Sequence, residues 1–306
     1  MISRRQFLRW LAAFGAGGAL TFTYGAVEPL LRPRIARYAL RPARWPDGLE
    51  LTIAVLADLH ACRPWMTPER IRSIVDETNR LGADLIVLLG DYIGSHRFIT
   101  GFVDASEWSG ALSGLKAPLG VHAILGNHDW WQDRAVQQAG VGPPAAKGAL
   151  QAAGFPVYEN EVVRLSKSGS AFWLAGLGDQ LAFWPSRRRR PGRRIGVDDL
   201  AGTLAKVTDD APVILLAHEP DIAVRVPDRV ALMLSGHTHG GQVRLFGWSP
   251  VVPSRYGNRF AYGHVRERCD VIVSGGLGCS IIPVRLGVPP EIVLVTVRGR
   301  DGQGRS

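Results

Sequence analysis

The sequence predicts an α/β fold whose strands end in polar side chains at one edge. Five apolar, β-favouring runs have the pattern of strands buried on both faces. Each run is followed at once by Asp, Asn or His. Ligands bind beyond the carboxyl ends of strands in open α/β sheets. Five strands of one sheet would therefore bring these polar side chains together at a single edge.

The first 27 residues are typical of a targeting segment. A basic head, Ser3–Arg9, precedes an uncharged stretch, Trp10–Val27, which fits an export signal or a single membrane anchor. The head, with Arg4 and Arg5 adjacent, resembles the twin-arginine export motif, whose pathway carries folded proteins. Either alternative puts the body outside, in the periplasm or at the extracytoplasmic face of the cytoplasmic membrane. No A-x-A site precedes residue 28, so both cleavage and retention as an anchor stay open.

Composition and proline content define the remaining organisation. Residues 28–50 are rich in proline, which argues against a long helix, and we expect a linker that holds at most a first strand. We expect one globular body over residues 51–298 and a disordered tail over residues 299–306. The 306 residues are 46% hydrophobic and 21% charged, which supports a full core and excludes wholesale disorder.

The five runs end in residues that can bind metal ions. In chain order they are LTIAVLADLH with Asp58 and His60, ADLIVLLGD with Asp91, GVHAILGNHD with Asn127, His128 and Asp129, APVILLAHEPD with His218, and VALMLSGHTHGG with His237 and His239. A lone Asp after a strand is usually a turn or a helix cap, and a lone His is usually a hydrogen-bonded polar residue. Five such endings together are hard to produce by chance. The spacings D-x-H and H-x-H also point alternate residues to the same side of an extended segment.

The positions of glycines and cysteines indicate what kind of metal site to expect. Gly90, Gly126 and Gly236 stand directly before the polar residues, where glycine permits close backbone approach. The three cysteines at positions 62, 269 and 279 show no CxxC spacing, so a thiolate zinc site is unsupported and buried free thiols are expected. Oxygen and imidazole ligands without thiolate suit Mn, Fe, Zn or Co.

The formal charge of +9 suits anionic partners. Much of the excess lies in the run Ser186–Arg194, which is either a solvated loop or a contact for an anionic lipid or substrate headgroup. We expect no nucleic-acid binding, because no recognised binding motif accompanies this run.

The strand-end motifs resemble the calcineurin-like metallophosphoesterase superfamily, in matching order over roughly residues 50–297. Three longer stretches are similar to a bacterial branch that carries twin-arginine signals or membrane anchors: GHTHGGQVRL, SRYGNRFAYG and SGGLGCSIIPVRLGVPPEIVLVTV. Members of that branch are similar to phosphodiesterases and to UDP-2,3-diacylglucosamine hydrolases of lipid A synthesis.

The resemblance implies a four-layer α/β/β/α sandwich with a dinuclear metal site at the C-terminal ends of the strands. It assigns Asp58, His60 and His239 to one divalent transition metal ion, Asn127, His218 and His237 to the other, and Asp91 to a bridge between them. His128 would assist the leaving group, and Asp129 would orient it. Arg255 and Arg285 are candidate phosphate contacts, because arginine suits phosphate geometry.

The function that this resemblance implies is phosphoester hydrolysis, most simply of a phosphodiester. A metal-bridging hydroxide would attack phosphorus in line while His128 protonates the leaving group. The alternative substrate is the lipid-linked pyrophosphate UDP-2,3-diacylglucosamine, and a minor alternative is a non-catalytic envelope scaffold on the same fold. The expected partners are a phosphoester, either soluble or lipid-linked, and the membrane through the N-terminal segment; the body is expected to be monomeric.

Overall fold

The structure is a computed structural model that describes residues 4–6, 9–10, 21, 23–185 and 195–299. Most of the export signal, the arginine run Ser186–Arg194 and the tail from residue 300 onward therefore lie outside the described residues. Within the described ranges, no helix combines the length and the apolar character that a membrane span requires.

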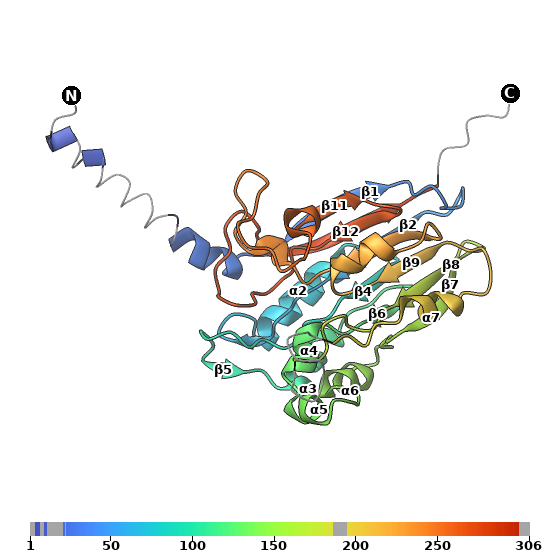
Figure 1. Ribbon diagram of the computed structural model, residues 1–306, viewed down its shortest axis with the longest axis horizontal. Helices are drawn as coiled ribbons and strands as arrows, with labels where there is room; N and C mark the ends of the chain where they lie inside the picture. The colour runs from blue at the N-terminus through green and yellow to red at the C-terminus, as the bar shows by residue number, and fades with distance from the viewer. Residues whose placement is uncertain (1–3, 7–8, 11–20, 22, 186–194, 300–306) are drawn as a thin grey trace.

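Two sheets form the centre of the fold (Figure 1). The five-stranded sheet has the order β1 (Arg34–Leu40), β13 (Glu291–Val297), β2 (Leu51–Leu56), β4 (Leu85–Leu88) and β6 (Val121–Ala123). The six-stranded sheet has the order β11 (Gly263–Arg266), β12 (Asp270–Val273), β10 (Val230–Ser235), β9 (Val213–Leu216), β8 (Ser170–Gly176) and β7 (Glu161–Lys167). A separate two-stranded ribbon pairs β3 (Cys62–Arg63) with β5 (Gly101–Phe102).

The five predicted strands are all present, but they are divided between the two sheets. Strands β2, β4 and β6 are parallel neighbours in one sheet, and β9 and β10 are parallel neighbours in the other. The expectation of five strands in one sheet is therefore wrong. An apolar run fits a strand buried on both faces equally well in a single sheet and in two packed sheets, because each strand is covered on both sides in either case.

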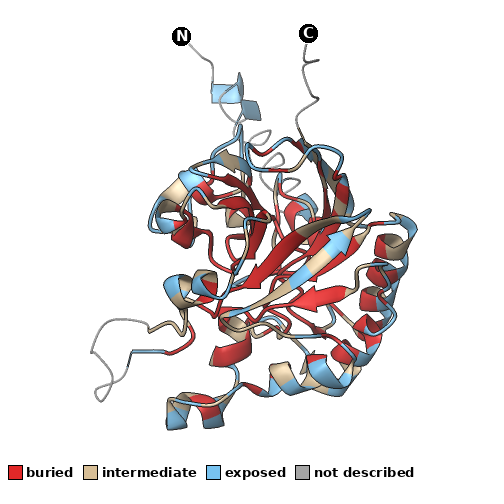
Figure 2. Cartoon of the chain, turned by 90° about the vertical axis from the view of Figure 1, so that its right-hand side faces the viewer, coloured by how far each residue is buried: buried red, intermediate tan, exposed pale blue. Residues whose placement is uncertain are grey.

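Alternate side chains of the strands enter different cores. Ile53 and Val55 of β2 point into the core between the sheets, whereas Ala54 and Leu56 pack beneath the helices. This period of two is what an extended strand imposes. Figure 2 shows the central strands as buried. The layers are thus helix, sheet, sheet and helix, which confirms the expected four-layer sandwich.

Helices cover the outer face of each sheet. The five-stranded sheet is covered by α2 (Pro68–Arg80), α3 (Ala105–Leu112) and α6 (Ala145–Ala152), with the short helices α4 (Asn127–Trp131) and α5 (Arg134–Ala139) beside them. The six-stranded sheet is covered by α7 (Leu200–Ala205) and the 3-10 helix η2 (Pro220–Arg225). Three further 3-10 turns are η1 (Glu28–Leu30), η3 (His239–Gly241) and η4 (Gly257–Phe260).

Helix α2 shows how local sequence sets one of these elements. The Thr67 side chain accepts a hydrogen bond from the backbone N–H of Arg70, and Pro68 occupies the first helical position, where its missing N–H costs nothing. Ile71, Ile74 and Val75 lie on one face and are buried in the core beneath the helix.

Candidate metal centre

The ends of four strands bring six of the predicted metal ligands together. Two groups of side chains each place their donor atoms within 4.8 Å of one another. The first group is Asp58, His60, Asp91 and His239, and the second is Asp91, His218 and His237. Asp91 belongs to both groups, so the two candidate positions for a cation adjoin one another.

The seventh predicted ligand, Asn127, lies at the beginning of α4. Its side-chain Oδ1 is 2.7 Å from Nδ1 of His237, which belongs to the second donor group. The amide oxygen therefore faces the same small volume as the imidazole nitrogen.

The backbone is strained where these side chains leave the strands. Nine non-glycine residues in the described chain have a positive φ, and five of them are predicted ligands: Asp58, His60, Asp91, His237 and His239, with φ between 47° and 68°. Left-handed backbone at non-glycine residues is uncommon and concentrates at functional sites, because it turns a side chain where a regular strand would not. These turns direct the donor atoms inward.

Backbone carbonyls select the tautomers of two histidines. Nδ1 of His218 donates to the carbonyl oxygen of Leu89 at 2.6 Å, and Nδ1 of His60 lies 3.2 Å from the carbonyl oxygen of Ile93. With Nδ1 protonated, the Nε2 lone pair of each ring points into the centre. A backbone carbonyl that holds Nδ1–H is the usual support of a metal-binding imidazole.

The charges at the centre fit a bound cation. Burial, together with the nearby Asp91 carboxylate, raises the pKa of Asp58 to about 7 despite the opposing charge of His218. Burial lowers the pKa of His60 to about 3 and, with His60 and Arg285 beside it, holds the pKa of His239 well below its usual range. Buried carboxylates beside neutral imidazoles form a donor set whose charge a divalent cation compensates.

Two buried polar atoms without a hydrogen bond also support a bound cation. Asp58 Oδ2 and His218 Nε2 are buried and make no hydrogen bond of acceptable geometry, although His218 Nε2 lies 3.2 Å from Asp91 Oδ2. Burial lowers the pKa of His218, but the Asp91 carboxylate outweighs burial and raises this pKa well above the usual range. Buried polar atoms are normally satisfied, and a cation at each donor group would satisfy the unpaired atom there in place of a proton.

Glycine is required where the strand ends meet. A Cβ atom built on Gly126 would lie 2.5 Å from Asp91 Oδ1 and 2.6 Å from His218 Cε1. A Cβ on Gly90, which has a φ of 93°, would lie 2.3 Å from the backbone nitrogen of Gly126. The centre is therefore packed against bare backbone, as the glycines before the polar residues predicted.

His128 lies beside the donor groups. Its ring makes an edge contact with the ring of His60, with 4.8 Å between centroids, and a tilted contact with Trp131 at 5.1 Å. Nδ1 of His128 lies 3.2 Å from Ser95 Oγ, and Nε2 lies 3.3 Å from Ser280 Oγ. The residue is only partly buried, so its ring can reach a bound molecule.

Asp129 holds the loops rather than the histidine ring. Its Oδ2 accepts from the backbone N–H of Asp91 and of Gly126, each at 2.9 Å, and its Oδ1 accepts from the N–H of Tyr92 at 2.8 Å. The expectation that this carboxylate orients the His128 ring is corrected in that respect. Asp129 joins the end of β4 to the beginning of α4 and so sets the position of Asp91.

Arg285 also differs from its expected role. Its side chain is wholly buried, donates to the backbone carbonyls of Gly278 and Val288, and brings Nη2 within 3.3 Å of Nδ1 of His239. A buried guanidinium that holds a loop is not available as a surface contact for phosphate. Arg255 is exposed, and its backbone N–H donates to Asp221.

Sequence analysis missed a buried pair of carboxyl groups behind His218. Burial and the charge of Glu219 raise the pKa of Asp179 well above its usual range, and burial also raises the pKa of Glu219. Glu219 Oε2 accepts from the backbone N–H of Gln180 at 3.1 Å. The only sequence signal was the position of Glu219 directly after His218; nothing local indicated Asp179, Ser95 or Ser280.

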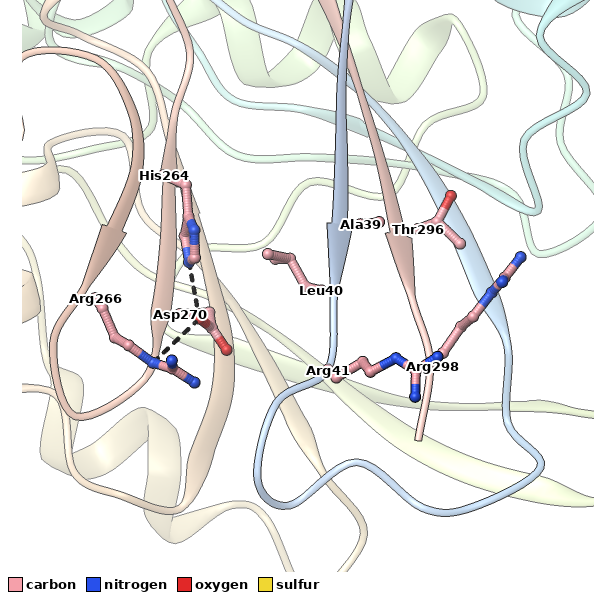
Figure 3. A pocket seen from close by; sticks show the side chains of 8 residues that line it. All are labelled: Ala39, Leu40, Arg41, His264, Arg266, Asp270, Thr296 and Arg298. Carbon is pink, nitrogen blue, oxygen red and sulfur yellow. Dashed lines mark hydrogen bonds and ion pairs between the residues drawn. The ribbon is translucent and has the colours of Figure 1, made fainter. Parts of the chain in front are cut away.

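A separate cavity of about 370 Å³ lies at the other end of the sandwich. Figure 3 shows its lining, with Leu40, Arg41, Thr296 and Arg298 on one side and His264, Arg266 and Asp270 on the other. Val297 of β13 pairs with Leu51 at the beginning of β2, so this end is remote from Asp58. The cavity contains none of the predicted site residues.

Comparison with known proteins identifies the family of the chain. Residues 51–241 match the calcineurin-like phosphoesterase family, and residues 1–21 match the signal sequence of the twin-arginine translocation pathway. An uncharacterized metallophosphoesterase of Bacillus subtilis, YkuE, is 31% identical over 98% of this chain and 99% of its own length. An uncharacterized metallophosphoesterase of Aquifex aeolicus is 29% identical, with 87% and 92% covered.

A third relative carries a more specific name. Phosphodiesterase YaeI of Escherichia coli is 30% identical over 96% of this chain and 99% of its own length. The family match covers most of the chain and includes both donor groups at the strand ends. The chain therefore belongs to the calcineurin-like phosphoesterase family and is a metal-dependent phosphoester hydrolase with a twin-arginine export signal.

Proposed function

We propose that this chain is a phosphodiesterase that acts outside the cytoplasm with two divalent transition metal ions. The observation that carries this proposal is the sharing of Asp91 between two groups of donor side chains. A single carboxylate between two cations about 3.5–4 Å apart is the usual arrangement of a two-metal phosphoester hydrolase. The export signal over residues 1–21 supports action beyond the cytoplasmic membrane.

The proposed ligand sets follow the two donor groups. Asp58, His60 and His239 would hold one ion, and Asn127, His218 and His237 would hold the other, with Asp91 between them. Support comes from the burial of the side chains and from the orphaned atoms of Asp58 and His218. The donors are oxygen and imidazole nitrogen, which suits Mn, Fe, Zn or Co. Cys62 stays outside the set: its thiol lies 3.8 Å from His96 Nε2, and burial raises its pKa to about 11.

The proposed chemistry is hydrolysis by in-line displacement at phosphorus. The two metal ions, when bound, supply an activated water and neutralise charge on the phosphoryl oxygens. His128 would hold a proton on its ring and give it to the leaving oxygen, since the ring borders the donor groups and remains partly exposed. Its backbone N–H donates to Asp91 Oδ1 at 2.7 Å, which couples the position of the proton donor to that of the shared carboxylate.

Asp129 would act as a positioning residue. Its three backbone hydrogen bonds fix the turn that presents Asp91. Precise placement matters because phosphoryl transfer depends mainly on positioning and on charge stabilisation. A displaced Asp91 would disturb both candidate ion positions at once.

A phosphodiester is the substrate class that we favour. Support comes from the phosphodiesterase YaeI of E. coli, which aligns over nearly the whole of both chains. The alternative, a lipid-linked pyrophosphate such as UDP-2,3-diacylglucosamine, is separated from it by rates on a panel of soluble diesters, phospholipids and nucleotide-linked lipids. A preference for the nucleotide-linked lipid over every diester would replace our assignment.

The experiment is hydrolysis of bis(p-nitrophenyl) phosphate by the full chain supplied with Mn²⁺, followed by addition of EDTA. We expect turnover that EDTA abolishes. His128→Ala is expected to keep its metal content and lose turnover by about 10²-fold or more, the usual contribution of a general acid. A wild-type chain that carries metal and hydrolyses no ester on the panel would favour a non-catalytic scaffold instead.

A further inference from the structure

A hairpin near the metal centre presents large apolar side chains to solvent. Leu245 and Trp248 exchange backbone hydrogen bonds at 2.9 and 3.0 Å across a two-residue turn, in which Phe246 has a φ of 51° and Gly247 a φ of 80°. Positive φ at both central residues is typical of a type I′ hairpin turn. The left-handed conformation is unfavourable for a bulky side chain, yet Phe246 occupies it and is completely exposed, beside Leu245 and Trp248 at 50% and 60%.

A second apolar loop is joined to this hairpin. Ile281 and Ile282 are 75% and 42% exposed. The side-chain amide of Gln242 donates to the backbone carbonyl of Ile282 at 2.8 Å, and the backbone N–H of Arg244 donates to the carbonyl of Leu286 at 2.8 Å. These bonds hold the second loop against the base of the hairpin.

The segment that follows the export signal completes the same surface. The backbone N–H of Arg285 donates to the carbonyl of Gly25 at 2.9 Å, and the buried carboxylate of Glu28 accepts from the N–H of Gly287 at 3.2 Å. Arg70 of α2 also donates to the backbone carbonyls of residues 29–31. We define the apolar rim as the exposed residues Tyr24, Val27, Leu30, Leu31, Leu245, Phe246, Trp248, Ile281 and Ile282.

Ser280 and Gln242 connect the apolar rim to the metal centre. Ser280, whose Oγ is 3.3 Å from His128 Nε2, immediately precedes Ile281. Gln242 links the two features again, because its Oε1 accepts from the backbone N–H of Ser280 at 2.8 Å. In Figure 1 the blue ribbon of residues 23–30 lies on the same side of the sandwich as the orange loops that precede β11.

The charges near the apolar rim indicate what kind of partner this surface binds. Residues 242–258 and 280–287 contain no Asp or Glu, and the one acidic residue of segment 23–33, Glu28, is buried. The exposed charges within these segments are basic and include Arg32 and Arg255, while the adjoining acidic groups are Glu69 of α2 and Asp221, which accepts from the backbone N–H of Arg255. Apolar and aromatic tips with basic neighbours are typical of surfaces that enter the headgroup region of an anionic bilayer.

The short length of chain between the export signal and the apolar rim also supports a bilayer as the partner. The match to the export signal ends at residue 21, and Gly25 is already hydrogen-bonded to the body. Four residues span at most about 14 Å when fully extended. A signal segment held in the membrane would thus keep Gly25, which is hydrogen-bonded beside the apolar rim, within about 14 Å of it.

We propose that the apolar rim is a bilayer-docking surface, which enters the headgroup region of an anionic phospholipid membrane and turns the metal centre toward it. Docking requires no catalytic turnover, so this proposal and the proposed hydrolysis fail independently. The substrate class that it favours is a phosphoester carried on a lipid, within reach of a centre held at the membrane surface.

The test places an environment-sensitive fluorophore, nitrobenzoxadiazole, on the full chain at Phe246→Cys. The native thiols of Cys62, Cys269 and Cys279 are buried, so the introduced thiol is the accessible one in the described chain. The matched control is Val141→Cys, which is also an exposed apolar position (72%) but lies between α5 and α6, away from the apolar rim. Vesicles of phosphatidylglycerol and phosphatidylethanolamine, with and without a doxyl-labelled lipid, serve as the probe.

We expect blue-shifted emission at position 246 that doxyl lipid quenches, and no change at position 141. Co-sedimentation of the chain with vesicles while the probe at 246 stays unchanged would mean that the signal segment alone binds, and would overturn the proposal. Failure to bind vesicles at all would also overturn it. A blue shift that grows with chain concentration in the absence of vesicles would instead assign the apolar rim to a second copy of the chain.

A second pair of variants measures, without a fluorophore, how much the Phe246 side chain contributes to vesicle affinity. Phe246→Ser is expected to weaken vesicle binding about tenfold, as expected for one large apolar side chain left in water, while Val141→Ser leaves it unchanged. Both variants should hydrolyse a soluble diester at the wild-type rate. Equal vesicle affinities for the two variants would contradict docking through the apolar rim.

Discussion

Replacing Gly126 with alanine tests how tightly the strand ends pack around the donor groups. The added Cβ would lie 2.5 Å from Asp91 Oδ1, 2.6 Å from His218 Cε1 and 2.7 Å from the backbone nitrogen of Asp91. The backbone at Gly126 is extended, with φ of −116° and ψ of 173°, so alanine meets no dihedral strain there. The effect of Gly126→Ala is therefore steric and confined to the centre.

The size of the effect follows from these distances. An ordinary van der Waals contact begins at 3.4 Å, so Asp91 Oδ1 must move by about 0.9 Å. Misplacement of a catalytic group by about 1 Å costs about 10²-fold in rate. Disturbed support of a ligand typically lowers metal affinity by about 10–100-fold. We expect losses of this order in both turnover and metal affinity for Gly126→Ala.

The assay compares metal content after dialysis and the rate of diester hydrolysis with those of Gly148→Ala. Gly148 lies inside α6, and a Cβ there meets no atom within 4 Å. Alanine at Gly148 should leave activity intact and add up to about 1 kcal/mol of stability, as a helix interior favours. If Gly126→Ala retained both its metal and its wild-type rate, the proposed crowding of Asp91 and His218 would be refuted.

Three further changes test other parts of the account. Asp129→Asn leaves at least one of three buried backbone N–H groups without an acceptor. Calorimetry should show a free energy of unfolding lower by about 2–3 kcal/mol and a Tm lower by about 5–10 °C. An unchanged Tm would contradict the proposed role of these three hydrogen bonds. Trp108→Ala removes a fully buried ring that stacks on Tyr92 at 5.1 Å, and urea unfolding should show a loss of about 3–5 kcal/mol; a loss below about 1 kcal/mol would contradict its place in the core. Burial raises the pKa of the Cys62 and Cys269 thiols to about 11 and about 12, so both stay protonated at pH 8 and should react with Ellman's reagent only after unfolding; rapid reaction of the native chain would contradict their burial.

The sequence predicted the strands and the donor positions because both leave local signals. In the run Leu51–Leu56 every residue except Thr52 is apolar, so both faces of the strand carry apolar side chains, as a strand covered on both sides requires. Polar residues at its end must then lie at a sheet edge, whichever sheet contains the strand. This is why the donor groups come together even though the expected single sheet is two sheets.

The parts that sequence analysis did not predict depend on contacts between distant segments. Ser280 lies 152 positions from His128, and Arg285 lies 46 positions from His239. No periodicity or spacing encodes such pairs, because each loop is shaped by what it packs against. The role of Asp129 was misjudged for a related reason: its neighbour in sequence is His128, but its carboxylate turns to the backbone of Asp91 and Tyr92.

The most direct test of the central claim is the number of metal ions bound per chain, measured by elemental analysis of protein matured in its native host, for wild type and for Asp91→Ala. If Asp91 serves both candidate positions, the wild type should carry two divalent transition metal ions per chain, and the variant should retain at most one. A wild type without stoichiometric metal, or a variant that keeps both ions, would contradict the shared carboxylate on which the proposed function depends.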